Sequence, residues 1–335
     1  MKKKVTYLIG AGASCNSLPV LNNMAARMEE QIIFLKKTDE NLSLEQSEEF
    51  NQDELNEYIN DLHWLINASR NHATVDTYAK NLFIKRDSHL EKLKNCLSVF
   101  LLIEQLKNAI DPRYDTFFAS MLDTNLDMPM DLNIISWNYD MQFEMAYQLF
   151  TSEIMLDSVQ DRLGVYLKHN SNIVNLTKKF GIYKLNGSSV AFSSNNAKLM
   201  KVYARLSNKN IAISTLKEIF KSYSLFKNNL KDYTLGLSFS WETENVQEGN
   251  DIVSITQRQT TNTEILVIIG YSIPYFNRDV DRNIIQNMSK LQKVYFQSPE
   301  ADAIIERFGS IRDDINSSNL IPINNCDQFY IPNEL

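Results

Sequence analysis

The sequence predicts an α/β protein in which helices cover both faces of one mostly parallel sheet, the doubly wound arrangement. Short runs of β-branched, aromatic and aliphatic residues alternate along the chain with longer stretches of helical periodicity. A glycine-rich turn follows the first of these runs. The predicted strands lie near residues 4–10, 131–137, 181–186, 264–270 and 293–297.

The composition is that of a globular chain with a sizeable core. The 335 residues are 44% hydrophobic and carry a net charge of −7, which disfavours wholesale binding of nucleic acid. The three cysteines form no C-x-x-C pair, and a cytoplasmic location is therefore expected. No run approaches the ~18 apolar residues of a membrane span, and the apolar run behind the basic start is too short for a secretion signal.

The first strand runs directly into a turn of small residues, Gly10-Ala11-Gly12-Ala13-Ser14. A strand, a glycine-rich turn and a following helix are the parts of a Rossmann-like dinucleotide site, in which backbone N–H groups hold a pyrophosphate. The pattern G-x-G-x-x-G is incomplete, because Cys15 stands where its third glycine would fall. A tight turn with no ligand would leave the same signature.

The next 110 residues are predicted to be largely helical. A helix is expected over 19–34, followed by a loop or frayed helix to about Gln52 and an acidic helix over 53–68. Asp76 is a candidate N-cap, and Ser88-x-x-Glu91 has the spacing of a capping box. The acidic stretch is interpreted as one helix with a buried face, with an interface role left open.

Polar residues follow three further strands. Trp137-Asn138-Tyr139-Asp140, Asn186-Gly187-Ser188 and Gly270-Tyr271-Ser272 all stand at the carboxyl ends of predicted strands, where open α/β sheets bind ligands. Pro299 is predicted to occupy the first position of a last helix.

The segment 198–231 reverses the charge balance, with eight lysines and arginines against one acid and with aromatic residues between them. Such a pattern is typical of a solvated helix face over a buried aromatic side, and it also occurs where a protein contacts phosphates or an acidic partner. We expect any contact with nucleic acid to be weak or indirect.

Together the four turns resemble, in order and spacing, the sirtuin-like (silent information regulator two-like) domain family. The resemblance is greatest to the bacterial branch found in anti-phage defence proteins, and it covers the chain from about Lys4 to Phe308. It implies a single Rossmann-like domain over residues 1–335, with helical insertions at about 38–125 and 195–232. It also implies NAD as substrate.

The resemblance implies roles for individual residues. Asn138 and Asp140 would border the nicotinamide and its ribose as catalytic residues, and Asn186 would stand in the place of the catalytic histidine. The implied cofactor-binding residues are Gly10, Ala11, Gly12, Ala13, Ser14, Gly187, Ser188, Gly270, Tyr271 and Ser272.

Two departures from the family's pattern matter. Residues 189–260 contain no cysteine, so the four-cysteine zinc module of sirtuin deacylases is not expected, nor is any metal. Asn186 cannot accept a proton at neutral pH, as the family's histidine does. Three accounts remain open: a native site whose dissociative cleavage needs little base help, an engineered substitution, or a protein that binds the nucleotide without cleaving it.

We therefore expect an NAD⁺ glycohydrolase that releases nicotinamide and ADP-ribose and acts in bacterial antiviral defence by depleting NAD. The alternative is an NAD- or ADP-ribose-binding sensor or scaffold subunit. The resemblance also implies a homo-oligomer that pairs with a ring-forming DNA-translocase-type ATPase. The acidic segment 38–69 and the basic segment 198–231 could support such contacts.

Overall fold

The computed structural model describes residues 2–20, 23–44, 49–72, 74–153, 155–167, 180–193, 212–228, 233–239, 241–242 and 251–335. Much of the basic segment, including Lys198, Lys201, Arg205, Lys209 and Lys231, lies outside these residues.

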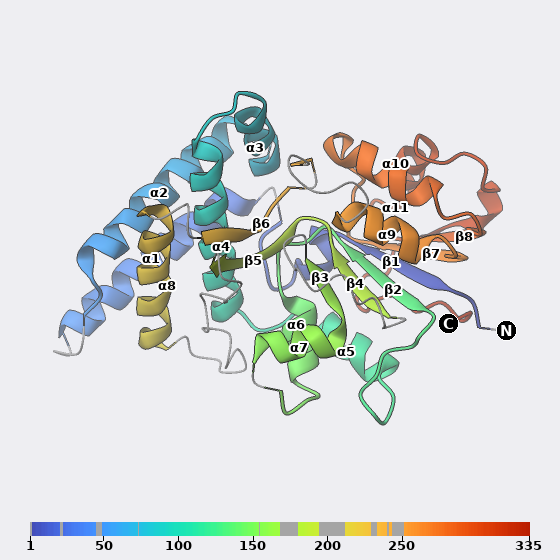
Figure 1. The fold of residues 1–335 in the computed structure, drawn as a ribbon, viewed down its shortest axis with the longest axis horizontal. Coiled ribbons are helices and arrows are strands. Elements are labelled where there is room, and N and C mark those ends of the chain that lie inside the picture. Colours follow the sequence, from blue (N-terminus) through green and yellow to red (C-terminus); the bar gives the residue numbers. More distant parts are fainter. Residues whose placement is uncertain are drawn as a thin grey trace. The chain divides into compact units, whose positions relative to one another are not determined.

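The described chain contains both strands and helices (Figure 1). The strands are β1 (Val5–Ile9), β2 (Leu132–Ser136), β3 (Val165–Leu167), β4 (Gly181–Lys184), β5 (Gly187–Ser193), β6 (Tyr233–Leu237), β7 (Ile265–Ile269), β8 (Lys293–Gln297) and β9 (Leu320–Ile323). The α-helices are α1 (Met24–Leu44), α2 (Gln52–Asn71), α3 (Val75–Ile84), α4 (His89–Lys107), α5 (Pro112–Met121), α6 (Gln142–Gln148), α7 (Leu156–Leu163), α8 (Ile213–Asn228), α9 (Ile252–Thr260), α10 (Arg278–Gln286) and α11 (Ala301–Gly309). Short 3₁₀ helices are η1 (Ala11–Ser14), η5 (Tyr275–Asn277) and η6 (Ser317–Asn319). The helices α1 to α5 follow one another between β1 and β2.

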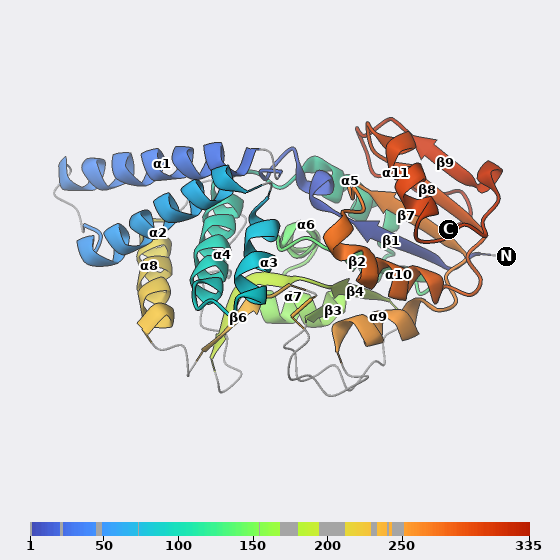
Figure 2. The same ribbon diagram turned by 90° about the horizontal axis from the view of Figure 1, so that it is seen from above.

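Seven strands form one sheet in the order β3-β4-β2-β1-β7-β8-β9, as Figure 2 shows, and every neighbouring pair in it is parallel. After β1, the chain places β2, β3 and β4 on one side of β1. It then places β7, β8 and β9 on the other side. The carboxyl end of β1 is therefore the switch point at which open sheets bind ligands. β5 and β6 form a separate two-stranded sheet.

Helices cover both faces of the seven-stranded sheet. Because side chains alternate along a strand, Tyr7 and Leu8 of β1 face opposite ways. The Tyr7 ring meets Phe117 of α5 edge-on, with ring centroids 5.3 Å apart. Leu8 belongs to an apolar cluster that includes Ile255 of α9 and Phe308 of α11. The predicted doubly wound, Rossmann-like α/β class is confirmed.

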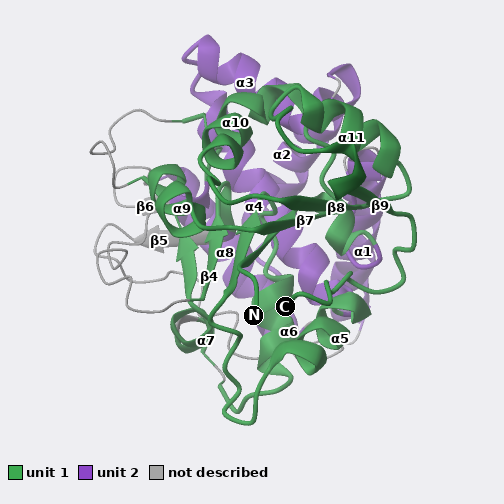
Figure 3. Ribbon diagram, turned by 90° about the vertical axis from the view of Figure 1, so that its right-hand side faces the viewer, with its two compact units in different colours: residues 1–15, 110–188, 238–335 green, residues 16–109, 189–237 purple. Residues whose placement is uncertain are grey.

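The chain divides into two compact units (Figure 3). Unit 1 comprises residues 1–15, 110–188 and 238–335 and contains the seven-stranded sheet. Unit 2 comprises residues 16–109 and 189–237 and contains α1 to α4, α8 and β6. The two segments of unit 2 overlap the predicted helical insertions, but α5 (Pro112–Met121) belongs to unit 1. The prediction of a single domain stays a prediction.

All five predicted strands are present, because each contains a short run of apolar residues that is buried in the sheet. The three-residue β3 was not predicted. β5 and β6 were not predicted either, because serine or glycine interrupts their apolar residues. β9 was not among the predicted strands, and it pairs in parallel with β8.

Several predicted helix starts were wrong. The helix expected over 19–34 begins at Met24 and continues to Leu44, which replaces much of the expected loop. Thr74, not Asp76, caps α3 by accepting from the N–H of Thr77. Ser88 makes no side-chain cap bond, because Asp87 instead accepts from the N–H of His89. Pro299 precedes α11 by two residues, in a turn where the Ser298 hydroxyl accepts from Glu300 N–H.

Unit 2 is held by ionic contacts between its acidic and basic helices. The Asp61 carboxylate of α2 is 5% exposed and contacts Lys92 Nζ of α4 at 2.7 Å and Lys227 Nζ of α8 at 2.8 Å. Burial alone would raise the pKa of Asp61, but hydrogen bonds from Lys227, Lys92 and Tyr223 outweigh it and lower that pKa. Part of the negative charge of the acidic segment 38–69 is therefore paired with lysines of the same chain, one of them in the basic segment 198–231.

Candidate functional site

The four predicted turns meet at the carboxyl edge of the sheet. They follow β1, β2, β4 and β7, which are neighbours in the order β4-β2-β1-β7 and all run in parallel. Parallel strands end at the same edge, so turns separated by more than 250 residues along the chain come together. The site lies within unit 1.

The turn after β1 packs its backbone directly on the turn after β7. Gly10 N–H donates to Ile269 O at 3.0 Å, and Gly12 N–H donates to Gly270 O at 2.9 Å. A Cβ on Gly10 would lie 2.7 Å from Gly270 O, and a Cβ on Gly12 would lie 2.8 Å from Gly270 Cα. Gly270 has φ +59°, and its own Cβ would lie 2.3 Å from Ala13 N. Close approach of two backbones thus explains all three glycines.

This packing limits what the turn can offer to a phosphate. The N–H groups of Gly10, Gly12 and Ala13 already donate to backbone carbonyls. Among the described residues, Ala11 N–H has no acceptor. The turn continues as the four-residue η1 (Ala11–Ser14), and α1 begins only at Met24, so the predicted helix N-terminus does not stand behind the turn.

Ser14 joins the first turn to the second. Its hydroxyl, 1% exposed, donates to Asp140 Oδ2 at 2.8 Å and lies 2.8 Å from the hydroxyl of Tyr114. Since the single hydroxyl proton of Ser14 goes to the carboxylate, Tyr114 is the donor to Ser14. Asn138 Nδ2 donates to Gly10 O at 3.1 Å and lies 3.4 Å from Ser14 Oγ. Asn138 Oδ1 has no partner among the described residues.

Asp140 is a buried carboxylate at the centre of these contacts. Its Oδ1 accepts from Gln142 N–H at 3.1 Å, and its backbone carbonyl accepts from Lys184 Nζ. Burial raises the pKa of Asp140 above its ordinary value, and the positive charge of Lys184 opposes that rise. Lys184 also pairs with Glu144 Oε1 at 2.9 Å, and both side chains are at most 1% exposed.

The third turn contacts the second through Asn186. Asn186 Nδ2 donates to Trp137 O at 3.2 Å, and Asn186 O accepts from Ser238 N–H at 3.0 Å. Gly187 has φ +71° and starts β5. The Ser188 hydroxyl is buried with no hydrogen-bond partner among the described residues. Asn138, Asp140 and Asn186 are each 6–7% exposed.

The fourth turn is tied to the second by a buried carboxylate. Tyr271 stacks on Trp137 with ring centroids 5.8 Å apart and an interplanar angle of 11°. Asp281 of α10 accepts from Trp137 Nε1 at 3.1 Å and from the Tyr271 hydroxyl at 2.7 Å. Burial raises the pKa of Asp281 to about 7, although both hydrogen bonds oppose the rise. Ser272 is exposed, and its carbonyl accepts from Arg307.

The raised pKa of Asp281 predicts that the stability of the fold depends on pH. In the folded protein the pKa of Asp281 lies above its ordinary value of ~3.9. The contribution of this carboxyl group to stability is therefore largest below pH ~3.9 and is lost as the pH rises through about 7. Between pH 5 and 7 the wild type should lose about 2 kcal/mol more of its free energy of unfolding than Asp281→Asn. Urea unfolding at a series of pH values measures this difference, and parallel curves for the two proteins would contradict it.

Besides Asp281, three further groups at this edge were not predicted as site residues. Tyr114 and Arg113 lie in α5, and the Arg113 guanidinium donates to Ala13 O at 2.9 Å and to Asp111 Oδ2 at 2.6 Å. No local pattern marks these two residues. Lys184 did leave a signal, because a lysine inside an otherwise apolar buried strand requires a partner.

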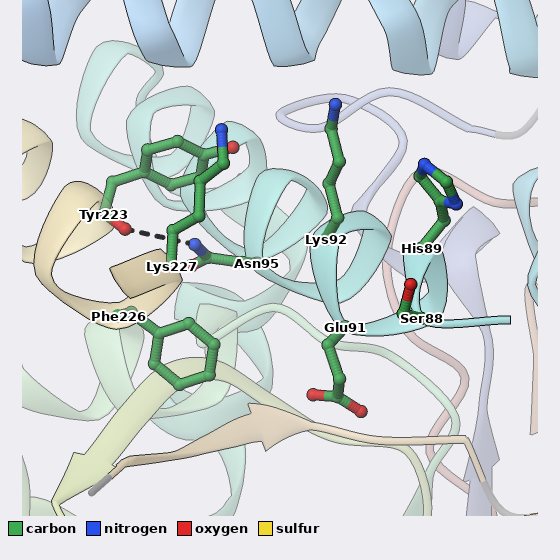
Figure 4. Close-up of a pocket in the computed structure, with 8 residues that line it drawn as sticks. All are labelled: Ser88, His89, Glu91, Lys92, Asn95, Tyr223, Phe226 and Lys227. Atoms are coloured by element: carbon green, nitrogen blue, oxygen red, sulfur yellow. Dashed lines mark hydrogen bonds between the residues drawn. The ribbon is translucent and has the colours of Figure 1, made fainter. Parts of the chain in front are cut away.

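A separate hollow of about 270 Å³ lies in unit 2 between α4 and α8 (Figure 4). Asn95, 4% exposed, points toward α8 and donates to Tyr223 O at 3.3 Å. Lys92 and Lys227 contribute to the wall, but both ammonium groups are bound to Asp61. None of the predicted site residues lines this hollow.

Within the described residues, no group of three or more histidine, cysteine or acidic side chains is placed to hold a metal ion. No helix there is long and apolar enough to cross a membrane. Compared with known protein families and with curated proteins, the chain matches none.

Proposed function

We propose that the chain is an NAD⁺ glycohydrolase that releases nicotinamide and ADP-ribose. One observation carries the proposal: four turns that resemble the sirtuin-like pattern are hydrogen-bonded directly to one another at the switch point of the sheet. Ser14 contacts Asp140, Asn138 contacts Gly10, Asn186 contacts Trp137, and Gly12 contacts Gly270.

The chemistry of these groups fits glycosidic cleavage. Departure of nicotinamide leaves positive charge on the ribose, and the Asp140 carboxylate would stabilise that charge. Asn138 Oδ1, free of protein partners among the described residues, would accept a hydrogen bond from the attacking water or from the nicotinamide amide. The fixed positions of Asn138 and Asp140 would supply the orientation that a weak base does not.

A binding function is the second candidate, and one observation favours it. Asn186 supplies an amide where general-base catalysis would need an imidazole, and its amide group donates to a backbone carbonyl. In this alternative the chain binds NAD or ADP-ribose as a sensor or scaffold subunit. A role in antiviral defence, a homo-oligomer and an ATPase partner belong to both candidates as proposals.

Release of nicotinamide from NAD⁺ tests the proposal, with Asn138→Ala as the diagnostic variant. We expect turnover by the wild type and about a hundredfold loss in Asn138→Ala, because the variant lacks the amide oxygen that would orient the water or the leaving group. Asn133→Ala is the matched control, since Asn133 lies within β2 rather than at its end. Binding of ADP-ribose without any nicotinamide release, with the purified protein and its assembled partner complex alike, would favour the sensor.

A further inference from the structure

The loop between β7 and α10 has an unusual backbone. Ile273 has φ +52° although it is β-branched, a conformation that such residues rarely adopt. Its side chain is 1% exposed and belongs to the apolar cluster beneath α9, α10 and α11. Burial therefore fixes this turn of the backbone and determines where the following residues, Tyr275 to Arg278, are presented. Such outliers often mark functional loops.

Arg278, the first residue of α10, lacks the partners that neighbouring arginines have. Among the described residues its guanidinium makes no hydrogen bond or ion pair, and its Nε is buried without an acceptor. By contrast, Arg282 contacts Asp279 at 3.7 Å, and Arg307 donates to Ser272 O at 2.7 Å. The Arg278 guanidinium lies 4.2 Å from the ring centroid of Tyr275, which is 75% exposed. This contact with the ring face holds the guanidinium in place but satisfies none of its five N–H donors.

The start of α10 lies against the candidate site. Asp281, three residues after Arg278 and on the same side of the helix, accepts from Trp137 and Tyr271, which follow β2 and β7. The first turn of α10 is thus docked on the edge of the sheet where the four motifs meet.

Two of the other cations at this edge are already neutralised. Lys184 pairs with Glu144, and Arg113 pairs with Asp111. In the glycine-rich turn, the N–H groups of Gly10, Gly12 and Ala13 donate to backbone carbonyls. Neither these two cations nor these N–H groups are free to neutralise two phosphates, whereas Arg278 offers a positive charge with donors to spare.

We propose that Arg278, held against the ring of Tyr275, binds the phosphate groups of the nucleotide at this site. The inference rests on the proposed function for the choice of a dinucleotide, but it requires only that the site take a phosphorylated ligand. The planar fork of the guanidinium matches two phosphate oxygens at once, which an ammonium group does not.

Equilibrium binding of ADP, inorganic pyrophosphate and adenosine to the full chain tests the proposal. Arg278→Ala should bind ADP and pyrophosphate about 10- to 100-fold more weakly than wild type, because it loses hydrogen bonds between charged groups. Affinity for adenosine, which has no phosphate, should change little. Arg278→Lys should be intermediate, and Arg282→Ala, one turn further along α10, should bind all three ligands as wild type does. Thermal unfolding confirms that each variant is folded.

The outcomes separate this inference from the proposed function. Equal affinity of wild type and Arg278→Ala for ADP overturns the inference and leaves NAD⁺ cleavage to be judged by nicotinamide release. An equal loss for adenosine and ADP also overturns it, because the effect would not depend on phosphate. If wild type binds neither ADP nor pyrophosphate, the inference fails as well. A selective loss of ADP binding without any NAD⁺ cleavage by wild type supports the inference and rejects the hydrolase.

Discussion

Asn186→His should raise the rate of NAD⁺ cleavage by about 10²–10⁴-fold, the range that general-base catalysis typically contributes. An imidazole at the end of β4 could accept a proton near neutral pH, whereas the amide of Asn186 cannot. Asn186 lies beside Trp137 O, at the same edge as Asn138 and Asp140, so the new base would act within the existing site. Nicotinamide release across pH 5–9 measures the gain and should show a new ionisation in the pH profile.

Asn186→Gln is the control for this substitution, because it alters the shape of the side chain but adds no base. It should show no gain. A folded Asn186→His protein that binds ADP-ribose but cleaves NAD⁺ no faster than wild type would contradict the prediction and favour the binding function. Activity in Asn186→His together with a silent wild type would mean that the site is assembled and lacks only its base.

Lys184→Met should lower the free energy of unfolding by about 3–5 kcal/mol, the usual cost of removing one partner from a buried ion pair. The substitution leaves the Glu144 carboxylate, which is fully buried, with a hydrogen bond from Gln160 Nε2 to Oε1 but without a positive charge. It also removes the hydrogen bond from Lys184 to the backbone carbonyl of Asp140. Urea unfolding at pH 7 measures the loss.

A double-mutant cycle separates the ion pair from the packing of the lysine stem. Lys184→Met combined with Glu144→Gln removes both charges and should recover much of the lost stability. Lys290→Met, at an exposed position, should stay within ~0.5 kcal/mol of wild type. If Lys184→Met loses less than ~1 kcal/mol, the pair does not stabilise this edge of the sheet and the prediction is wrong.

The sequence predicted the strands better than the helix ends. Each of the five predicted strands contains a local apolar run, and such a run is buried in almost any arrangement of the sheet. Helix starts depend on which side chain reaches which backbone N–H. Thr74 and Asp87 accept from the backbone where Asp76 and Ser88 had been expected to do so. These choices are decided by local geometry that composition does not encode.

The sequence predicted where the turns of the candidate site lie, but it did not predict which side chains contact one another there. The sequence by itself determined which turns meet at the carboxyl edge, because parallel strands that wind outward from β1 must end there together. It also placed glycine at positions 10, 12 and 270, since no side chain fits where the two backbones touch.

Only the tertiary structure decided the partners of the polar groups. Ser14 meets Tyr114 a hundred residues away, Trp137 meets Asp281, and Lys184 meets Glu144. Hydrogen bonds and ion pairs require atoms to lie within about 3 Å of each other, and buried polar groups must find such partners wherever the fold brings them. The same requirement singles out Arg278, whose guanidinium has no hydrogen-bond acceptor or ionic partner among the described residues of this chain.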